Sequence, residues 1–406
     1  MTPIQTDAGG VVSWMLAKGR FDTRMREFGT EMCERIVAAG IPISRAFCYV
    51  GTLHPQVGAA AYIWKRGEKD ATRVIGPRGI QASAEFTNSP FTVARNNRQT
   101  LRRRLIDPAC SMDFPVLSRL KEEGGTDYLV VPMVCSDGEV NAIAFLTDYP
   151  DGYSETDVAA LEQVGQVLSI IVELQSSRRI AKILMDTYLG PRTGARVLSG
   201  SIARGSGESI RAVIWLCDLR GFTALADRLP RDQLSAMLNE YFGIMVKAVT
   251  DEGGEVLKFV GDGMLAIFEL CKGEDVGPCC ASALRAARSA SAAADAINAT
   301  RRAEGSPEIR FGIALHLGEV YYGNIGSPDR LDFTVIGPAV NHAARLERLA
   351  SEQGRILVTS ASFAAAAREP LESLGRFNLR GVAEPQEVFA PASASVSSDS
   401  LTPPRN

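Results

Sequence analysis

Long apolar runs are missing from this sequence of 406 residues. No stretch of about 18 apolar residues occurs that could span a bilayer. The opening MTPIQTDAGG also lacks the basic and apolar segments of a signal peptide. We therefore expect neither a membrane span nor a signal peptide, and we expect a cytoplasmic location.

Paired cysteines and strong charge are missing as well. The eight cysteines are scattered and none forms a CxxC pair, so neither a zinc knuckle nor a disulfide framework is indicated. The formal net charge of −3 provides no general attraction to nucleic acid. The P-loop GxxxxGK[ST], HExxH and GxSxG patterns are absent, which argues against the common nucleotide triphosphatases, metalloproteases and esterases.

What the sequence does contain is enough apolar material, 46% of residues, for more than one core. Composition and pattern divide it into a mixed α/β region over 20–152, a helical connector over 153–209 and a second domain over 210–390. The remaining residues, 391–406, are poor in bulky apolar side chains and are predicted to be a disordered tail.

The connector begins with a long predicted helix over 153–189. Ser154 followed by Asp157 is similar to a helix-capping pair. An apolar stripe at a 3,4 spacing then comprises Leu161, Val164, Leu168 and Ile171. Gln175 interrupts this stripe, so two alternatives stay open: packing on the helix's own domain, or a seam between two copies of the chain.

The second domain alternates strand and helix patterns. Strands are predicted at 212–216, in a hairpin over 256–269, and at 309–317, 319–325 and 333–336, with a turn at Gly318. Helices are predicted after Pro230, over 281–302 and over 338–350. This order indicates an α+β sandwich with helices on one side of a mainly antiparallel sheet.

Two aspartates in this domain each follow an apolar strand and have a glycine nearby. Asp218 follows AVIWLC, and Asp262 lies between Gly261 and Gly263 at the tip of the hairpin. Adjacent strand ends would bring the two carboxylates together, where their repulsion favours a bound cation such as Mg²⁺. The structural alternative is that one caps a helix and the other forms a turn.

Asn341 and Arg345 are four residues apart on a predicted helix and therefore share one face. The arginine could neutralise a phosphoryl group, while the alternative is an ordinary solvated face.

Four ordered segments together resemble the catalytic domain of class III adenylyl/guanylyl cyclases: CDLRGFT at 217–223, LKFVGDGMLAIF at 257–268, ALHLGEVYYGNIG at 314–326 and FTVIGPAVNHAARLE at 333–347. The resemblance implies a ferredoxin-like α+β domain that converts ATP into 3′,5′-cyclic AMP and pyrophosphate. It also implies two Mg²⁺ or Mn²⁺ ions per active site, and a homodimer in which each site is shared between two chains.

The resemblance further implies roles for individual residues. Asp218 and Asp262 would hold the metal ions, with the carbonyl of Leu219 as a lesser ligand. The residues expected to bind or act on the nucleotide are Lys258 and Thr334 at the purine, Asn341 at the ribose, Arg345 at the transition-state phosphate and Arg380 at the triphosphate.

The purine position favours ATP over GTP. Lys258 can only donate hydrogen bonds and the hydroxyl of Thr334 can accept one, which suits the edge of adenine. Threonine at 334 departs from the aspartate that many members carry and is similar to a bicarbonate-responsive subgroup, so bicarbonate sensitivity is a hypothesis. Glu319 stands where some members have an arginine, which argues against that triphosphate contact.

The first half gives weaker signals. Residues 128–164 resemble the end of a GAF domain, which implies a sensory domain with a small-molecule ligand; the alternative is a dimerisation module. His54 is the half's single histidine and is interpreted as a surface residue. A basic cluster is interpreted as a solvated face rather than a nucleic-acid site and comprises Arg95, Arg98, Arg102, Arg103 and Arg104.

The leading hypothesis is thus an adenylate cyclase regulated by its N-terminal domain. A guanylate cyclase and a non-catalytic nucleotide-binding signalling protein are the alternatives.

Overall fold

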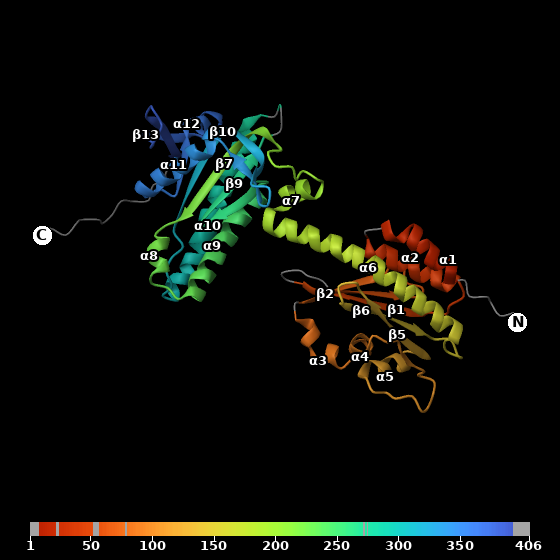
Figure 1. Ribbon diagram of the computed structural model, residues 1–406. Coiled ribbons are helices and arrows are strands. Elements are labelled where there is room, and N and C mark those ends of the chain that lie inside the picture. Colours follow the sequence, from red (N-terminus) through yellow and green to blue (C-terminus); the bar gives the residue numbers. More distant parts are fainter. Residues whose placement is uncertain are drawn as a thin grey trace. The chain divides into compact units, whose positions relative to one another are not determined.

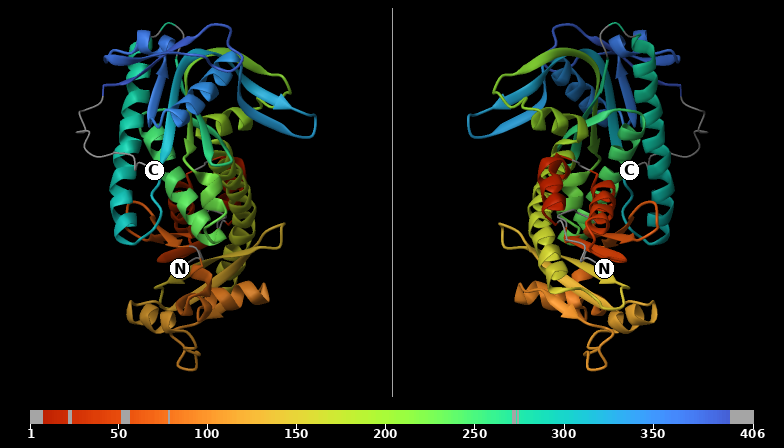
Figure 2. Two further views of the ribbon diagram at one scale, coloured as in Figure 1. Left: turned by 90° about the vertical axis from the view of Figure 1, so that its left-hand side faces the viewer. Right: turned by 90° about the vertical axis from the view of Figure 1, so that its right-hand side faces the viewer.

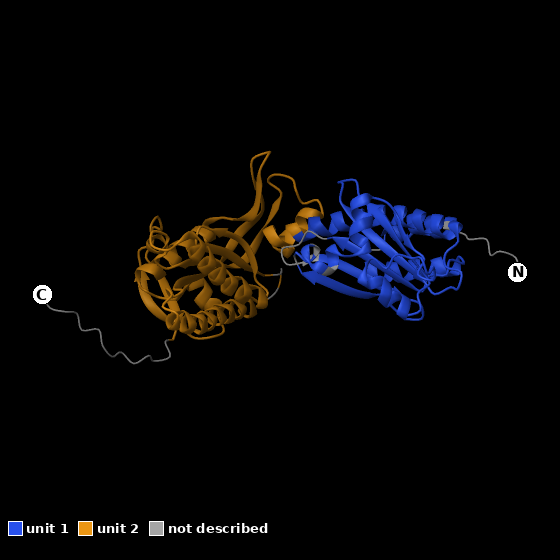
Figure 3. Cartoon of the chain, turned by 90° about the horizontal axis from the view of Figure 1, so that it is seen from below, with its two compact units in different colours: residues 1–183 blue, residues 184–406 orange. Residues whose placement is uncertain are grey.

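The computed structural model describes residues 8–21, 24–51, 57–77, 79–270, 273 and 275–392. The chain forms two compact units, Met1–Ile183 and Leu184–Asn406, which Figure 3 colours separately. His54 and nearly all of the predicted tail lie outside the described residues.

The first unit contains one antiparallel sheet, which has six strands among the described residues, in the order β3-β2-β1-β6-β5-β4. The strands are β1 (Arg45–Gly51), β2 (Val57–Lys65), β3 (Thr72–Pro77), β4 (Leu101–Arg103), β5 (Asp127–Val134) and β6 (Val140–Thr147). Strands β5 and β6 form a hairpin, since they pair along their length around Gly138, whose φ is 88°.

Helices cover both faces of this sheet (Figure 1). One core packs α1 (Ala8–Ala17), α2 (Met25–Ala38) and α6 (Glu155–Leu189) against the sheet. On the opposite face lie α3 (Ala84–Thr87), α4 (Pro90–Asn97) and α5 (Pro115–Glu122). Short 3₁₀ turns occur at Gly19–Phe21 and Ile80–Ala82.

The long helix α6 begins as predicted and buries the predicted stripe. The Ser154 amide and hydroxyl donate to Asp157 Oδ2, and the Asp157 amide donates back to Ser154 Oγ at 3.1 Å. Leu161, Val164 and the rest of that stripe are at most 1% exposed and belong to the first unit's core. Packing on its own domain is therefore the correct alternative for this stripe.

A different face of α6 carries large apolar residues that are exposed to solvent. Ile170 is 60% exposed, Leu174 37%, Leu184 36% and Tyr188 79%. With Ser177 and Ala181 these positions follow a 4,3 spacing, which is the pattern of a coiled-coil seam. The sequence analysis did not single out this second stripe, because burial in the first unit is not visible in the spacing alone.

The arginines of the basic cluster form ion pairs and hydrogen bonds within the first unit. Arg102 donates to the fully buried Asp127 at 2.8 Å and to Glu155 at 2.7 Å. Arg103 forms an ion pair with Asp113, and the other three arginines donate to the backbone carbonyls of Val140, Gly138 and Asp151. The cluster is therefore a structural feature of the fold rather than a plain solvated face.

The second unit contains a mainly antiparallel sheet, which has eight strands among the described residues, in the order β13-β14-β12-β10-β7-β9-β8 with β11 paired to β10. The strands are β7 (Gly207–Leu219), β8 (Glu255–Val260), β9 (Gly263–Glu269), β10 (Phe311–Gly326), β11 (Leu331–Ile336), β12 (Leu357–Ser360), β13 (Leu371–Phe377) and β14 (Gln386–Pro391). Only the β10–β12 pairing is parallel in this part of the chain. Figure 2 shows the β10–β11 hairpin extending from the body of the unit.

Helices cover both faces of this sheet too, which corrects the prediction of helices on one side. The helices are α7 (Pro191–Leu198), α8 (Phe222–Ala226), α9 (Arg231–Asp251), α10 (Val276–Ala303), α11 (Pro338–Glu352) and α12 (Ala361–Ala366). Alternate residues of β7 contact α9 and α10 on one face and the region of α11 on the other. The run AVIWL is apolar at every position, so both faces require cover.

Residues 311–326 form one strand, so the predicted turn at Gly318 is wrong. Gly318 pairs with Ala212 of β7 in the middle of β10. A Cβ at Gly318 would lie 2.6 Å from the Cβ of Ala339 on α11. The glycine is therefore needed for close packing of helix on strand, which a sequence pattern does not distinguish from a turn.

Helix α7 occupies part of the predicted connector and is joined to the sheet by a buried polar network. Glu255 on β8 is 4% exposed and accepts hydrogen bonds from the amide and hydroxyl of Thr193 at 2.9 and 2.8 Å. Tyr322 on β10 donates to the same carboxylate at 3.0 Å. These contacts hold α7 against β8 and β10.

Two expectations from composition can be compared with the structure. None of the helices in the described part of the chain has the length and hydropathy of a membrane span. The seven cysteines within the described residues are all free thiols.

Candidate active site

The two predicted metal carboxylates meet at one end of the second unit's sheet. Asp218 is the penultimate residue of β7, and Asp262 lies in the turn between β8 and β9. Because Cys217 pairs with Met264 of β9, the end of β7 lies beside this turn. A Cβ at Gly263 would lie 3.1 Å from Asp218 Oδ1 and 3.0 Å from the Cys217 carbonyl, so the glycine allows the close approach.

The electrostatics of the pair reflect this crowding. Burial, and then the charge and hydrogen bond of Asp262, raise the pKa of Asp218 from 3.8 to about 6. The structure thus brings the two carboxyl groups within hydrogen-bonding reach, as the sequence predicted. Two adjacent carboxyl oxygens are suitable ligands for Mg²⁺, which takes one or two protein carboxylates and completes its shell with water and phosphate oxygens.

The donor set is small. No group of three or more His, Cys, Asp or Glu side chains that could hold a metal occurs among the described residues. Leu219 follows Asp218, and its side chain is buried in the sheet's core at 3% exposed. A metal here would therefore depend on the two aspartates, on backbone oxygen such as the Leu219 carbonyl, and on its nucleotide.

An ion pair beside the aspartates was missed by sequence reasoning. Arg220 Nη1 donates to Glu347 Oε1 on α11 at 3.1 Å, and both side chains are under 20% exposed. The Arg220 guanidinium crosses Gly312, where any Cβ would overlap it. Burial raises the pKa of Glu347, Arg220 opposes this, and the charges of Asp218 and Asp262 contribute to the rise. Glu347 therefore lies within electrostatic range of the carboxylate pair.

The two residues predicted to read the purine lie near one another on β8 and β11. Lys258 Nζ donates to Asp332 Oδ2 at 2.7 Å, which links β8 to the strand that carries Thr334. Thr334 is 4% exposed, and its hydroxyl oxygen has no hydrogen-bond partner within the described residues. A buried hydroxyl without a partner costs about 1–3 kcal/mol, so it is suited to meeting a ligand.

The residues predicted to act on the ribose and phosphates lie on α11 and near it. Asn341 is exposed on the first turns of α11, and Arg345 is partly buried one turn later. The Arg345 guanidinium lies against the turn that contains Arg380, since a Cβ at Gly381 would be 3.3 Å from its Nη2. Asn341, Arg345 and Arg380 therefore occupy one region of the unit.

Charged neighbours shift the pKa values of two groups in this part of the unit. The charge of Asp262 raises the pKa of Asp218, and that of Arg220 lowers it. Burial, and then the charge of Arg345, lower the pKa of His342 on α11.

The His342 ring stacks on His316 of β10 with centroids 4.4 Å apart. Burial, and then the charge of His342, lower the pKa of His316 from 6.5 to about 4. The unfolded chain therefore binds a proton between these values that the folded chain does not, so stability is lost as the pH falls through this window.

We expect replacement of His316 by Gln to reduce this pH sensitivity. Allowing for partial solvent exposure, wild type should lose on the order of 1–2 kcal/mol from this group between about pH 7 and pH 4. Calorimetric unfolding midpoints at both pH values measure the effect. An equal fall in midpoint for wild type and His316→Gln would contradict the assignment.

Part of the second unit is similar to known proteins. Residues 208–390, just under half of the chain, match the family model of the adenylate and guanylate cyclase catalytic domain. The similarity supports the predicted class III adenylyl/guanylyl cyclase catalytic domain in this part of the chain.

Two curated relatives illustrate the extent of the match. An adenylate cyclase of Anabaena cylindrica is 36% identical over 164 residues, which are 39% of this chain and 31% of that protein. An uncharacterized protein of Mycobacterium tuberculosis is 36% identical over 231 residues, which are 55% of this chain and 40% of that protein. The chain therefore spans between about a third and two fifths of the length of these relatives.

Similar solved structures include cyclases of both kinds. The adenylyl cyclase CyaB from P. aeruginosa is 22% identical, with a TM-score of 0.43, and the match covers 48% of this chain and 100% of that one. The guanylyl cyclase Cya2 is 28% identical, with a TM-score of 0.40 and coverage of 45% and 92%.

Proposed function

We propose that the chain is an adenylate cyclase that forms 3′,5′-cyclic AMP and pyrophosphate from ATP at sites shared between two copies. The observation that carries this proposal is the meeting of Asp218 and Asp262 at the end of β7, inside a domain similar to cyclase catalytic domains.

Two divalent cations, Mg²⁺ or Mn²⁺, fit the crowded carboxyl groups. Asp218 and Asp262 would hold them, with the Leu219 carbonyl as a further oxygen ligand. Bound there, the cations would lower the pKa of the ribose 3′-hydroxyl and neutralise the leaving pyrophosphate.

The chain's own residues then have separable roles in the reaction. The 3′-hydroxyl attacks the α-phosphorus and its proton is released to water. The bond from the α-phosphorus to the oxygen shared with the β-phosphorus breaks, pyrophosphate leaves, and negative charge gathers on the phosphoryl oxygens during the step. Arg345 neutralises that charge, Asn341 orients the ribose, and Arg380 holds the triphosphate. Lys258 donates to the adenine ring nitrogen, and Thr334 accepts from the adenine amino group.

The similarity to cyclase catalytic domains leads us to propose a homodimer. A two-fold pair would place the aspartates of one chain opposite the Arg345 region of the other, which gives two equivalent sites. The exposed 4,3 stripe on α6 independently favours pairing with a second copy, since a parallel coiled coil would cover Ile170, Leu174, Leu184 and Tyr188.

The proposal is tested by giving the purified protein ATP or GTP with Mg²⁺ or Mn²⁺ and measuring cyclic nucleotide and pyrophosphate. Cyclic AMP formed in preference to cyclic GMP is the expected result. Preferential cyclic GMP would identify a guanylate cyclase, and no product from either would favour a non-catalytic nucleotide-binding protein.

Base preference gives a sharper prediction. Lys258→Glu should lower kcat/KM for ATP by about 10- to 100-fold, because it removes the donor and places a carboxylate beside the purine. GTP turnover should fall less or rise, since a carboxylate accepts from guanine. Lys247→Glu, an exposed lysine on α9, is the control for charge reversal. An unchanged ATP/GTP ratio for Lys258→Glu would remove this residue from the base-reading site.

We also propose that the first unit is a GAF-like sensory domain that regulates the cyclase. The support is its antiparallel sheet with helices on both faces, and the hairpin and capped helix at its end. Deleting the first unit should change the rate or its response to added ligands; identical rates under all conditions would argue against regulation.

A further inference from the structure

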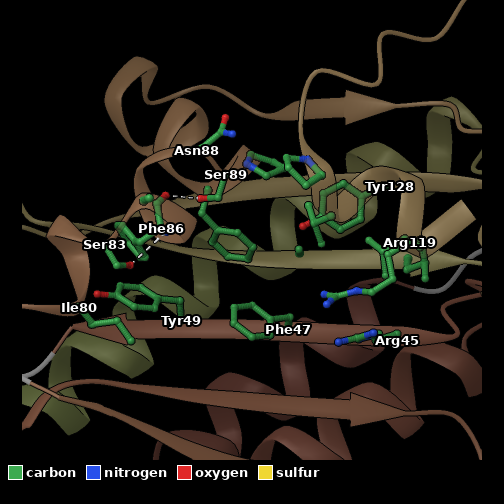
Figure 4. Close-up of a pocket in the computed structure, with 18 residues that line it drawn as sticks. Arg45, Phe47, Tyr49, Ile80, Ser83, Phe86, Asn88, Ser89, Arg119 and Tyr128 are labelled. Atoms are coloured by element: carbon green, nitrogen blue, oxygen red, sulfur yellow. Dashed lines mark hydrogen bonds between the residues drawn. The ribbon is translucent and has the colours of Figure 1, made fainter.

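The first unit contains a pocket of about 620 Å³ between its sheet and the helices α3, α4 and α5 (Figure 4). This volume is in the usual range for small-molecule sites. Its floor is formed by Phe47 and Tyr49 of β1, Tyr128 of β5, and Ala144 and Leu146 of β6. The pocket lies entirely within the first unit and does not depend on the proposed cyclase activity.

The pocket exists because small side chains face large ones across the sheet. Ala144 pairs with Phe47 on one side and with Val130 on the other, and its methyl group leaves space above the strand. Aromatic rings frame that space: Phe47 packs edge-on against Phe91 at 5.1 Å, and Tyr49 packs against Phe86 at 5.0 Å. Such ring faces and edges suit a flat apolar ligand.

The charged groups on the pocket wall are both positive. Arg45 and Arg119 are the only charged residues among the described residues that line it. They share a single carboxylate, Glu123, at 3.3 Å and 3.9 Å, which leaves one net positive charge at this end of the pocket. Figure 4 shows both arginine side chains at one end, with Ile80, Ser83 and Asn88 toward the other.

The neutral polar groups at the opposite end are mostly engaged already. Ser83 Oγ accepts from the Phe86 amide at 3.3 Å, and Ser89 Oγ donates to the Phe86 carbonyl at 2.6 Å. These serines hold the short helix α3 in place. The pocket therefore has few side chains that could form hydrogen bonds with a nucleotide base. Recognition would therefore come from shape, aromatic contact and the two arginines.

We propose that this pocket binds an elongated, mostly apolar aromatic carboxylate. Its rings lie against Phe47, Tyr49 and Phe91, and its carboxylate is held by Arg45 and Arg119. A guanidinium pair suits a planar carboxylate because each can donate parallel hydrogen bonds.

Calorimetric titration of the full-length protein with naphthoate and with its neutral isostere naphthamide tests this proposal. Naphthoate should bind wild type at least about tenfold more tightly than naphthamide, because hydrogen bonds to a charged group are the stronger kind. Arg45→Met and Arg119→Met should each reduce this preference toward unity while retaining naphthamide binding. Lys121→Met, on the same helix as Arg119 but outside the pocket lining, should keep the preference intact.

A fourth variant tests the apolar part of the pocket. Ala144→Leu should weaken the binding of both compounds, and its thermal unfolding midpoint checks that the variant is folded. The two arginine variants test the proposal independently of that result. Failure of naphthoate to bind wild type, or equal preference in wild type and both arginine variants, would overturn the proposal. So would displacement of naphthoate by lower concentrations of cyclic AMP, which would identify a nucleotide site instead.

Discussion

Asp262→Asn is expected to lower cyclase activity by at least about 100-fold while leaving the fold intact. The amide keeps the size of the side chain at the hairpin tip but removes one of two charges that would hold the cations. The replacement also removes the repulsion that helps to raise the pKa of Asp218, so the variant should be at least as stable as wild type without metal. Product formation with Mn²⁺ and the thermal midpoint with and without Mn²⁺ and ATP measure both effects.

Asp137→Asn is the matched control for this replacement. Asp137 lies in the β5–β6 turn before Gly138, and its carboxylate accepts from the Glu139 amide at 3.0 Å. It thus has the turn-forming role that was the alternative for Asp262, but in the first unit and outside the proposed active site. Activity should be retained in Asp137→Asn. Wild-type activity in Asp262→Asn, or an undiminished Mn²⁺-induced rise in its thermal midpoint, would show that the metal site is misassigned.

Mixing two inactive variants should restore activity. If one chain supplies the aspartates and its partner supplies Arg345, a heterodimer of Asp262→Asn and Arg345→Ala contains one intact site and one doubly damaged site. Random pairing of equal amounts makes half of the dimers mixed, so about a quarter of wild-type activity is expected. The assay is cyclic nucleotide formation after the two proteins are refolded or coexpressed together.

A third variant makes this experiment specific. Asp218→Asn mixed with Asp262→Asn should stay inactive, because both aspartates of a site come from the same chain and no intact pair remains. Recovery in this control, or no recovery in the first mixture despite proven heterodimers, would contradict a site shared as proposed. The same mixing experiment can test the exposed stripe of α6. Adding Leu174→Glu to both variants of the first mixture should reduce dimer formation, and with it the recovered activity, if that stripe pairs with a second copy.

The sequence predicted those parts of the site that depend on short segments. The positions of Asp218 at the end of a strand and of Asp262 in a turn can be predicted from the neighbouring residues, an apolar run and two glycines. The pairing of β7 with β9 then brings the two aspartates together. The hairpins and the capped start of α6 were predictable for the same reason, since each depends on neighbouring residues.

Features that depend on residues distant in sequence were not predictable. The Arg220–Glu347 ion pair joins positions 127 residues apart, and neither residue shows its partner in the local pattern. The burial of the Leu161 stripe and the exposure of the Ile170 stripe depend on which face of α6 meets the first unit's sheet. The Ala144 pocket likewise requires knowing that three helices stand above a strand rich in alanine.

The Glu255 network has a mechanical consequence. Thr193 of α7 and Tyr322 of β10 donate hydrogen bonds to one buried carboxylate on β8. Gly190 is the single residue between the end of α6 and the start of α7. A displacement of the end of α6 within the second unit would therefore act on β8 through α7, and β8 is the strand that carries Lys258.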